Sequence, residues 1–232
     1  MLKEIRSRLA KLSDPVAAKS VAGFFKESIK THGLKSSDVK AIAKEYFPRI
    51  DNMDKVQVFA LCEELMRSDY QEQFGIACKF AYRMRKNFEK KDFKIFERWV
   101  RNYINNWAKC DTFCNHTVAD LMEKFPDLVF DVKKWADSDN RWVRRAAAVT
   151  FILPARHGRF IGDVFEIADI LLVDEDDMVQ KGYGWALKAA GEAQPQMVYD
   201  FVTARRARMP RTAYRYAIEK LPADMRAAAM AL

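Results

Sequence analysis

The sequence predicts an all-α fold, and three observations support that prediction. Apolar residues recur at helical spacing nearly everywhere, as in residues 56–66 and 164–172, whereas period-two alternation is almost absent. Only 8 Gly and 7 Pro in 232 residues are too few turn-forming residues for a β-sandwich or barrel. Half of the residues are hydrophobic, which is enough for a full core. We therefore expect residues 1–232 to form a single helical domain.

Helix start and stop signals divide the chain roughly every 12 to 20 residues, which predicts about a dozen short helices. In chain order the breaks fall at residues 13–15 (SDP), 32–33 (HG), Pro48, 68–69 (SD), 125–126 (FP), 138–140 (SDN), 174–177 (DEDD), 194–195 (QP) and Pro210. Ser36 and Ser37, followed by Asp38, have the pattern of a helix N-cap.

A frame of 36 residues relates several of these segments to one another. Residues 138–146 (SDNRWVRRA) align with residues 174–182 (DEDDMVQKG). The same interval of 36 residues, taken toward the N-terminus, aligns Lys109 with Arg145. The spacing is close to that of HEAT and armadillo repeats, whose two-helix units bury their apolar faces only by stacking. We expect a curved solenoid of HEAT-like repeats, with a non-repetitive helical bundle as the alternative.

The charge distribution favours a polyanionic partner. The chain has 40 basic and 32 acidic residues, a net charge of +8. Residues 83–109 contain nine basic and three acidic residues, interleaved with aromatic ones, and residues 201–220 contain six basic and one acidic. The simpler interpretation of the first cluster is a solvated helix face with core aromatics behind it. In the 36-residue frame, Lys109, Arg145 and Lys181 form a ladder of cations along one wall, suited to a nucleic-acid backbone.

Four motifs carry a resemblance to a known family. They are residues 21–26 (VAGFFK), 105–111 (NNWAKCD), 138–147 (SDNRWVRRAA) and 180–188 (QKGYGWALK). In this order and spacing they resemble the AlkD-type DNA alkylation repair glycosylases, a family built from HEAT-like repeats. The resemblance implies hydrolysis of the N-glycosidic bond of cationic N-alkylated purines, of the 3-methyladenine and 7-methylguanine types. It also implies that duplex DNA binds in a basic concave groove and that no metal or cofactor takes part.

The resemblance assigns roles to particular residues. It places the catalytic aspartate on Asp111, the two site tryptophans on Trp107 and Trp185, and a phosphate-binding arginine on Arg145. The full set of DNA contacts that we expect is Phe24, Ser36, Lys40, Lys109, Arg145, Lys181 and Lys188. The sequence departs from the family at two places: Phe24 stands where Tyr is common, and residues 107–111 (WAKCD) replace the commoner Trp-Asp-x-Val-Asp.

The residue types fit this chemistry independently of the resemblance. An alkylated purine is already a cation and a good leaving group, so the site must stabilise an oxocarbenium-like sugar and position a water. An ionised carboxylate does that work, and Trp107 and Asp111, four residues apart, share one helix face. Tryptophan faces attract a desolvated cation by on the order of 1 to 2 kcal/mol. The neighbouring residues are small and have no side chain that could hydrogen-bond to the edge of a base: Ala108, Gly182, Gly184 and Ala186. We therefore expect the protein to select damaged bases by their positive charge.

Other interpretations stay open beside this one. A lone aspartate near a helix start is typically a cap or a surface charge, and Trp99, Trp135 and Trp142 are interpreted as core residues. Cys110, Cys114 and His116 lack a full tetrahedral ligand set, which favours free thiols over a metal site. The rival functions are a catalytically inactive relative that binds DNA and a HEAT-type protein-interaction scaffold.

The remaining expectations concern the setting of the protein. Four cysteines are too few for a disulfide framework, the N-terminus has no apolar signal core, and no apolar run is long enough to span a membrane. We expect a cytoplasmic protein, on the nucleoid when bound to DNA. We also expect a monomer whose partner is double-stranded DNA with alkylated bases, without an obligate protein partner.

Overall fold

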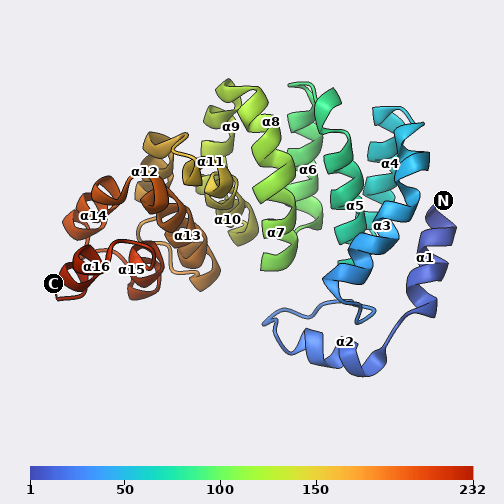
Figure 1. Cartoon of the computed structure of the whole chain (residues 1–232), viewed down its shortest axis with the longest axis horizontal. Coiled ribbons are helices and arrows are strands. Elements are labelled where there is room, and N and C mark those ends of the chain that lie inside the picture. Colours follow the sequence, from blue (N-terminus) through green and yellow to red (C-terminus); the bar gives the residue numbers. More distant parts are fainter. Residues whose placement is uncertain (232) are drawn as a thin grey trace. The chain divides into compact units, whose positions relative to one another are not determined.

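The protein is described by a computed structural model that covers residues 1–231. It divides into two compact units, residues 1–113 and the residues from Cys114 onward (Figure 1). Within the described residues the elements are helices, and the one β contact is an isolated bridge between Lys30 and Tyr70. The all-α prediction is therefore confirmed. None of the described helices combines the length and apolar character that crossing a membrane requires.

The first unit is a stack of helices. Its elements are α1 (Leu2–Lys11), α2 (Pro15–Ala22), α3 (Ser36–Asp51), α4 (Lys55–Met66), α5 (Gln71–Arg83), a 3-10 turn (Arg85–Asn87), α6 (Asp92–Tyr103) and α7 (Trp107–Phe113). Helix α5 packs against α3 on one side and against α7 on the other, and α4 also contacts α5 (Figure 1). Alternate helices therefore lie side by side, as expected of stacked repeats.

Most of the predicted breaks in this unit are confirmed, with two corrections. Asp14 caps α2 through its side chain, ahead of Pro15, and the turn before α5 contains Asp69 with a left-handed φ of 66°. Pro48 does not end its helix, because α3 continues through it to Asp51 and the lost N–H costs only one bond near the C-terminus. The predicted N-cap is also wrong: Ser36 is the first residue of α3, and Lys35 precedes it without a side-chain cap.

The core of the first unit contains the aromatic residues of its basic segment. The rings of Phe96 and Trp99 pack around Phe59 and Phe113, with centroids 5.5 to 5.8 Å apart. Phe88 and Phe93 are buried as well. For these residues the simpler interpretation is correct: they are the hydrophobic face of amphipathic helices, and they do not stack on a ligand.

The second unit repeats the same packing. Its elements are a π-helical turn (Cys114–Val118), α8 (Ala119–Lys124), a 3-10 turn (Pro126–Leu128), α9 (Val129–Lys133), a second 3-10 turn (Lys134–Asp137), α10 (Arg141–Val149), α11 (Ile152–Arg156), α12 (Ile161–Ile170), α13 (Asp177–Ala193), α14 (Pro195–Ala204), α15 (Arg211–Ile218) and α16 (Ala223–Ala231). Helix α13 packs between α10 and α15 (Figure 1). Trp135 and Trp142 are buried, as predicted, and so is Trp99 in the first unit.

The 36-residue frame holds for two pairs of neighbouring helices but is not constant along the chain. Helices α5 and α7 begin 36 residues apart, as do α10 and α13, whereas α7 and α10 begin 34 residues apart. Asn140 and Asp176, one frame apart, cap α10 and α13 through their side chains. Lys109 is consequently the third residue of its helix and Arg145 the fifth, so the predicted equivalence of these two residues is wrong.

The corrected register gives a different series. The fifth residues of α3, α5, α7, α10, α13 and α15 are Lys40, Gly75, Asp111, Arg145, Lys181 and Arg215. Four of these six positions carry a cation, one is glycine, and one carries a carboxylate. Asp111 is thus the one acid at a helix position that is basic in four of the other five helices.

Candidate functional site

In the first unit, the candidate site is built at the start of α7. Asn106 is fully buried, and its Oδ1 accepts a hydrogen bond from the backbone N–H of Lys109 at 3.0 Å, which caps the helix. Trp107 and Asp111 follow as the first and fifth helical residues, so their side chains lie one turn apart on one face. Both are half-buried, and a π-helical turn begins at Cys114 just beyond them. Such turns are frequent at functional sites.

The indole of Trp107 is held by a residue that the sequence did not single out. Phe25 stacks on it with ring centroids 5.3 Å apart and planes 15° apart. Its neighbour Phe24, the predicted DNA contact, is 78% exposed. The only signal in the sequence was the pair of adjacent phenylalanines, which does not say which ring faces inward.

Lys109 does not occupy the exposed wall on which it was predicted. The residue is 2% exposed, and its Nζ donates to Asp69 Oδ1 at 2.5 Å and to Asn105 Oδ1 at 2.9 Å. Burial lowers the pKa of Lys109, although the hydrogen bond to Asp69 opposes that shift. Burial alone would raise the pKa of Asp69, but hydrogen bonds from Lys109 and Asn105 hold it below its ordinary value. Lys109 therefore joins α7 to the turn before α5. Because its ammonium group is buried there, the prediction that it contacts DNA is wrong.

In the second unit, Arg145 lies between helices. It is 4% exposed, and its Nη1 donates to the backbone carbonyl of Met178. A Cβ at Gly182 on α13 would lie 3.2 Å from Arg145 Cγ, so the two helices approach closely here. The expectation of an exposed ladder is therefore wrong for Arg145 as well as for Lys109. The role of Arg145 as a phosphate ligand stays a prediction.

The other predicted residues of this unit are partly accessible. Trp185 is half-buried on α13, in contrast to the buried core tryptophans. Lys181 pairs with Asp177 at 3.2 Å and Lys188 with Glu219 at 3.1 Å. Gly182, Gly184 and Ala186 are buried, so they serve helix packing and do not line an open site. A Cβ at Gly184 would lie 2.8 Å from the backbone oxygen of Ala213 on α15.

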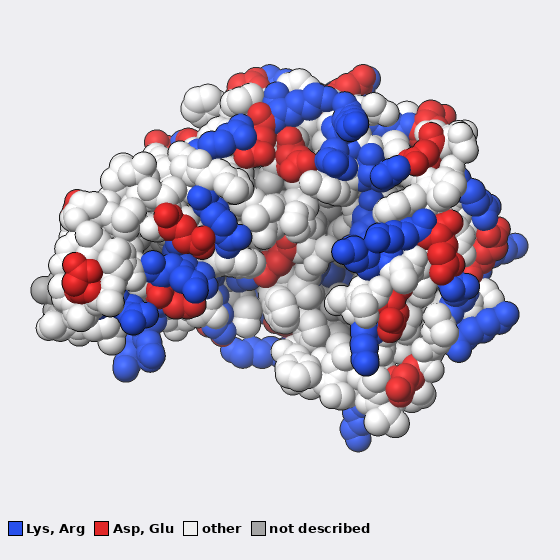
Figure 2. Space-filling model, viewed as in Figure 1, with Lys and Arg blue, Asp and Glu red and all other residues white. Residues whose placement is uncertain are grey.

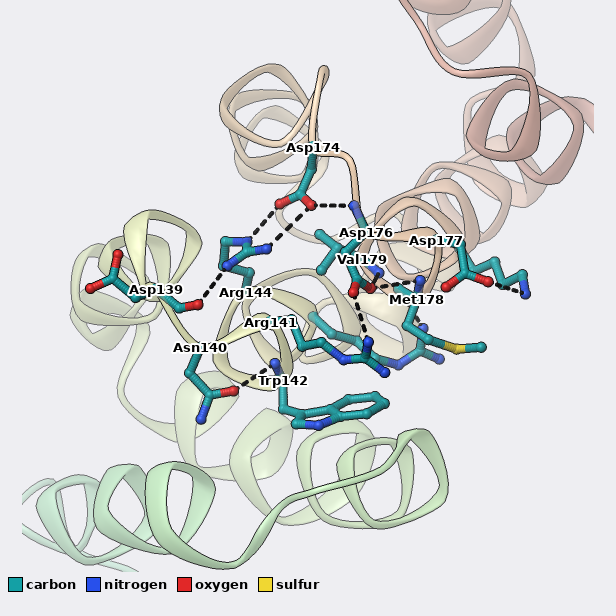
Figure 3. Close-up of polar contacts among 12 residues, drawn as sticks. Asp139, Asn140, Arg141, Trp142, Arg144, Asp174, Asp176, Asp177, Met178 and Val179 are labelled. Carbon is teal, nitrogen blue, oxygen red and sulfur yellow. Dashed lines mark hydrogen bonds and ion pairs between the residues drawn. The ribbon is translucent and has the colours of Figure 1, made fainter. Parts of the chain in front are cut away.

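The acidic turn before α13 is a structural clamp. Arg144 on α10 donates to Asp174 at 2.6 Å and also binds the backbone carbonyls of Ser138 and Asp139, while Arg141 pairs with Asp176 at 3.0 Å (Figure 3). Together with Arg145, which binds the Met178 carbonyl, these two arginines hold the turn and the start of α13 in place. They are not available to a ligand without breaking these pairs.

The two predicted DNA contacts on α3 lie on the surface. Ser36 and Lys40 are exposed, and Ser37 Oγ donates to Asp38 Oδ1 at 3.3 Å. Lys40 has no ion pair among the residues that the structure describes. Of the predicted cations it is the one with an uncommitted ammonium group.

The basic clusters differ in how much of their charge is paired. On the first unit, Arg83 pairs with Asp51, Arg98 with Glu63 and Arg101 with Glu97. On the second, the basic residues Arg208, Arg211, Arg215 and Lys220 are exposed and have no ion pair within the described part of the chain. Figure 2 shows lysine and arginine side chains on both units, with acidic side chains among them. Of the two basic clusters, the one in residues 201–220 therefore carries more unpaired charge.

The four cysteines are buried and form no disulfide, and His116 is exposed. Within residues 1–231, no three His, Cys, Asp or Glu side chains are grouped so that they could hold a metal ion.

The stacked helices define an α-α repeat protein. Its helix α7 carries a tryptophan–carboxylate pair, and the carboxylate occupies a helix position that is basic in most of the other stacked helices. The sequence model of the DNA alkylation repair enzyme family matches residues 5–221, and the chain belongs to that family. A solved structure described as a predicted DNA alkylation repair enzyme from Enterococcus faecalis is similar, with a TM-score of 0.81 and 16% identity over 91% of this chain and 97% of that one. That identity supports the fold alone. Comparison with curated proteins finds no similar sequence.

Proposed function

We propose that this member of the DNA alkylation repair enzyme family is a monofunctional DNA glycosylase. It hydrolyses the N-glycosidic bond of cationic N-alkylated purines, of the 3-methyladenine and 7-methylguanine types, in duplex DNA. Asp111 is the catalytic carboxylate, and Trp107 and Trp185 are the site tryptophans. Trp185 enters this proposal through the sequence resemblance, whereas Trp107 and Asp111 are also supported by their shared face on α7.

The observation that carries the proposal is the half-buried Asp111 at a helix position that is basic in four other helices. A protein that only binds the DNA backbone gains nothing from an acid at this place, because a carboxylate repels phosphate. A carboxylate that stabilises an oxocarbenium-like sugar explains the exception, since the developing positive charge needs a preorganised anion.

The remaining predicted contacts serve DNA binding in this proposal. Lys40 and the exposed Phe24 meet DNA directly, and the backbone N–H groups at Ser36 suit a phosphate because no side chain caps α3. Lys181 and Lys188 exchange their carboxylate partners for phosphates. The unpaired arginines of residues 208–215 attract the polyanion over longer distances.

Selection follows the charge and the labile bond of the lesion. The tryptophan faces attract a cationic base, and Asp111 stabilises the sugar, so no reader of the base edge is needed. Cationic 3-methyl- and 7-methylpurines are released, whereas uncharged lesions such as uracil, hypoxanthine or ethenoadenine are not.

The test is base release from N-methylated duplex DNA, with the abasic product scored by alkali cleavage. Asp111→Asn keeps the side-chain size but removes the charge, so the single-turnover rate drops by roughly 10²-fold or more. DNA affinity holds or rises, because a negative charge has left a surface that binds polyanion. Asp120→Asn, a change of the same type on α8, is the control and keeps the wild-type rate. Retained turnover in Asp111→Asn contradicts the assignment, and binding without any base release in the wild type identifies an inactive relative.

A further inference from the structure

A single buried carboxylate holds the loop between α2 and α3. Glu72 is the second residue of α5 and is 3% exposed. Its Oε1 accepts hydrogen bonds from Thr31 Oγ1 at 2.6 Å, from the backbone N–H of His32 at 3.0 Å and from that of Leu34 at 3.2 Å. This carboxylate therefore fixes residues 31–34 to the start of α5.

The same end of the loop is fixed by other contacts. The backbone carbonyl of Lys30 accepts from Gln71 N at 2.9 Å, and the His32 ring stacks on Tyr70 with centroids 4.3 Å apart. Gly33 has a φ of +81°, and a Cβ there would lie 2.5 Å from backbone atoms at Asp14 and Ala18. Residues 30–34 thus pack against the start of α2 and the start of α5.

The other end of this loop contacts the candidate site. Phe25, a few residues earlier in the chain, stacks on Trp107 at the first position of α7. Helices α5 and α7 pack against each other. The loop therefore bridges two neighbouring helices, with Glu72 as its anchor on one and Trp107 as its contact on the other.

We propose that Glu72 is a positioning residue: by holding residues 31–34 on α5, it keeps Phe25 stacked on Trp107. The second oxygen of Glu72, Oε2, is buried and has no hydrogen-bond partner among the described residues. The hydrogen bonds of the carboxylate thus all go to the loop, and none joins α5 to another helix. The consequence for catalysis rests on the proposed function, whereas the consequence for the Trp107 environment does not.

Two measurements test this proposal. The first is acrylamide quenching of tryptophan fluorescence, compared between the wild-type and Trp107→Phe backgrounds so that the contribution of Trp107 is isolated. The second is the single-turnover rate of base release from N-methylated DNA. The variants are Glu72→Ala, Glu72→Gln, which keeps the accepting oxygen, and Thr31→Val, which removes one donor and is the milder change. All are measured at temperatures where each variant is folded by circular dichroism.

Gln73→Ala is the matched control. Gln73 is the next residue of α5 and is similarly buried, but its Oε1 accepts from Arg6 Nε on α1 at 3.1 Å. Its removal lowers stability without releasing the loop, so the Trp107 signal and the rate stay at wild-type values.

The expected results separate positioning from stability. Glu72→Ala raises the quenching of Trp107 and slows base release by roughly 10-fold, the scale of a small misplacement in a site. Glu72→Gln restores most of both signals, and Thr31→Val changes both in the same direction as Glu72→Ala but less. The effect of Glu72→Ala on the rate is largely absent in a Phe25→Ala background, because both changes act through the same contact.

The proposal is overturned if Trp107 quenching is unchanged in folded Glu72→Ala or, should that variant not fold, in Thr31→Val. It is also overturned if Gln73→Ala alters quenching as much as Glu72→Ala does. If the wild type releases no base while Glu72→Ala still exposes Trp107, the proposed glycosylase function fails and the positioning role of Glu72 stands.

Discussion

At the scale of single residues, the decisive property of a cation in this protein is whether a carboxylate already holds it. Lys109 and Lys40 are both lysines near the start of stacked helices, yet one is buried against Asp69 and the other is exposed without an ion pair in the described residues. Only the second has an ammonium group available for a phosphate. The difference yields a direct test.

Lys109→Met and Lys40→Ala should therefore behave in opposite ways. Lys109→Met lowers the free energy of unfolding by about 1.5 to 3 kcal/mol, the usual cost of losing hydrogen bonds to a charged group. It leaves the dependence of log K on log salt for DNA binding unchanged. Lys40→Ala keeps stability and reduces that slope by about one unit if it contacts one phosphate. Urea unfolding and DNA titrations at several salt concentrations measure both, and a flattened slope in Lys109→Met contradicts the buried role.

The Lys109–Asp69 pair also predicts a pH dependence. The pKa of Asp69 is lowered in the folded protein, so the carboxylate adds stability that is present above its unfolded pKa and lost as pH falls through the folded value. Asparagine tolerates the left-handed backbone at this turn, so Asp69→Asn removes the charge without straining the chain. The gap in unfolding free energy between the wild type and Asp69→Asn is constant above about pH 5 and narrows below about pH 4. Urea titrations at pH 7, 5 and 3 measure it, and a gap that widens in acid contradicts the sign.

At the scale of elements, glycine decides how closely α13 approaches its neighbours. A Cβ at Gly184 would meet the backbone oxygen of Ala213 and Tyr216 Cβ, each at 2.8 Å, and a backbone atom cannot move aside cheaply. Gly162, in contrast, lies on the exposed side of α12, where a Cβ would meet no neighbouring atom within 4 Å. The two glycines therefore form a matched pair.

Gly184→Ala lowers the free energy of unfolding by about 1 to 3 kcal/mol, because the extra methyl group overpacks the contact between α13 and α15. Gly162→Ala raises it by up to about 1 kcal/mol through helix propensity. Thermal or urea unfolding of the two variants checks the signs. Equal effects would mean that the close approach of α13 to α15 does not limit the side chain at position 184.

At the scale of the whole molecule, we propose that the chain is a single domain although its helices form two compact units. Residues 107–118 run as α7 and then directly as a π-helical turn, without Gly or Pro and without a polar linker. Domain boundaries normally fall in exposed, flexible segments.

This proposal predicts one cooperative unfolding transition. The calorimetric and van't Hoff enthalpies agree, and fluorescence reporters at Trp99 in the first unit and Trp135 in the second give coincident curves. Single-tryptophan variants provide these reporters, since both side chains are buried. Two separated transitions would show that the units fold independently.

Much of the fold could be predicted from the sequence because its signals are local. Helical periodicity and the break signals at residues 13–15, 138–140 and 174–177 each act over a few residues, and the structure confirms them: Asp14, Asn140 and Asp176 cap the helices that follow. The predicted break at Pro48 is wrong because a proline near a helix end is tolerated when only one backbone bond is lost. The family, too, was identified from local motifs, and the match over residues 5–221 confirms it.

The sequence by itself determined the helical class, several of the breaks between helices and the family, and the spacing of Trp107 and Asp111 placed them on one helix face. Only the tertiary structure decided which charges and rings are available. Asp69, which is 40 residues from Lys109 in the chain, neutralises that cation. Glu72 in turn fixes a loop about 40 residues before it. A side chain's partner across such a separation depends on how the helices pack, and neither periodicity nor residue type records it.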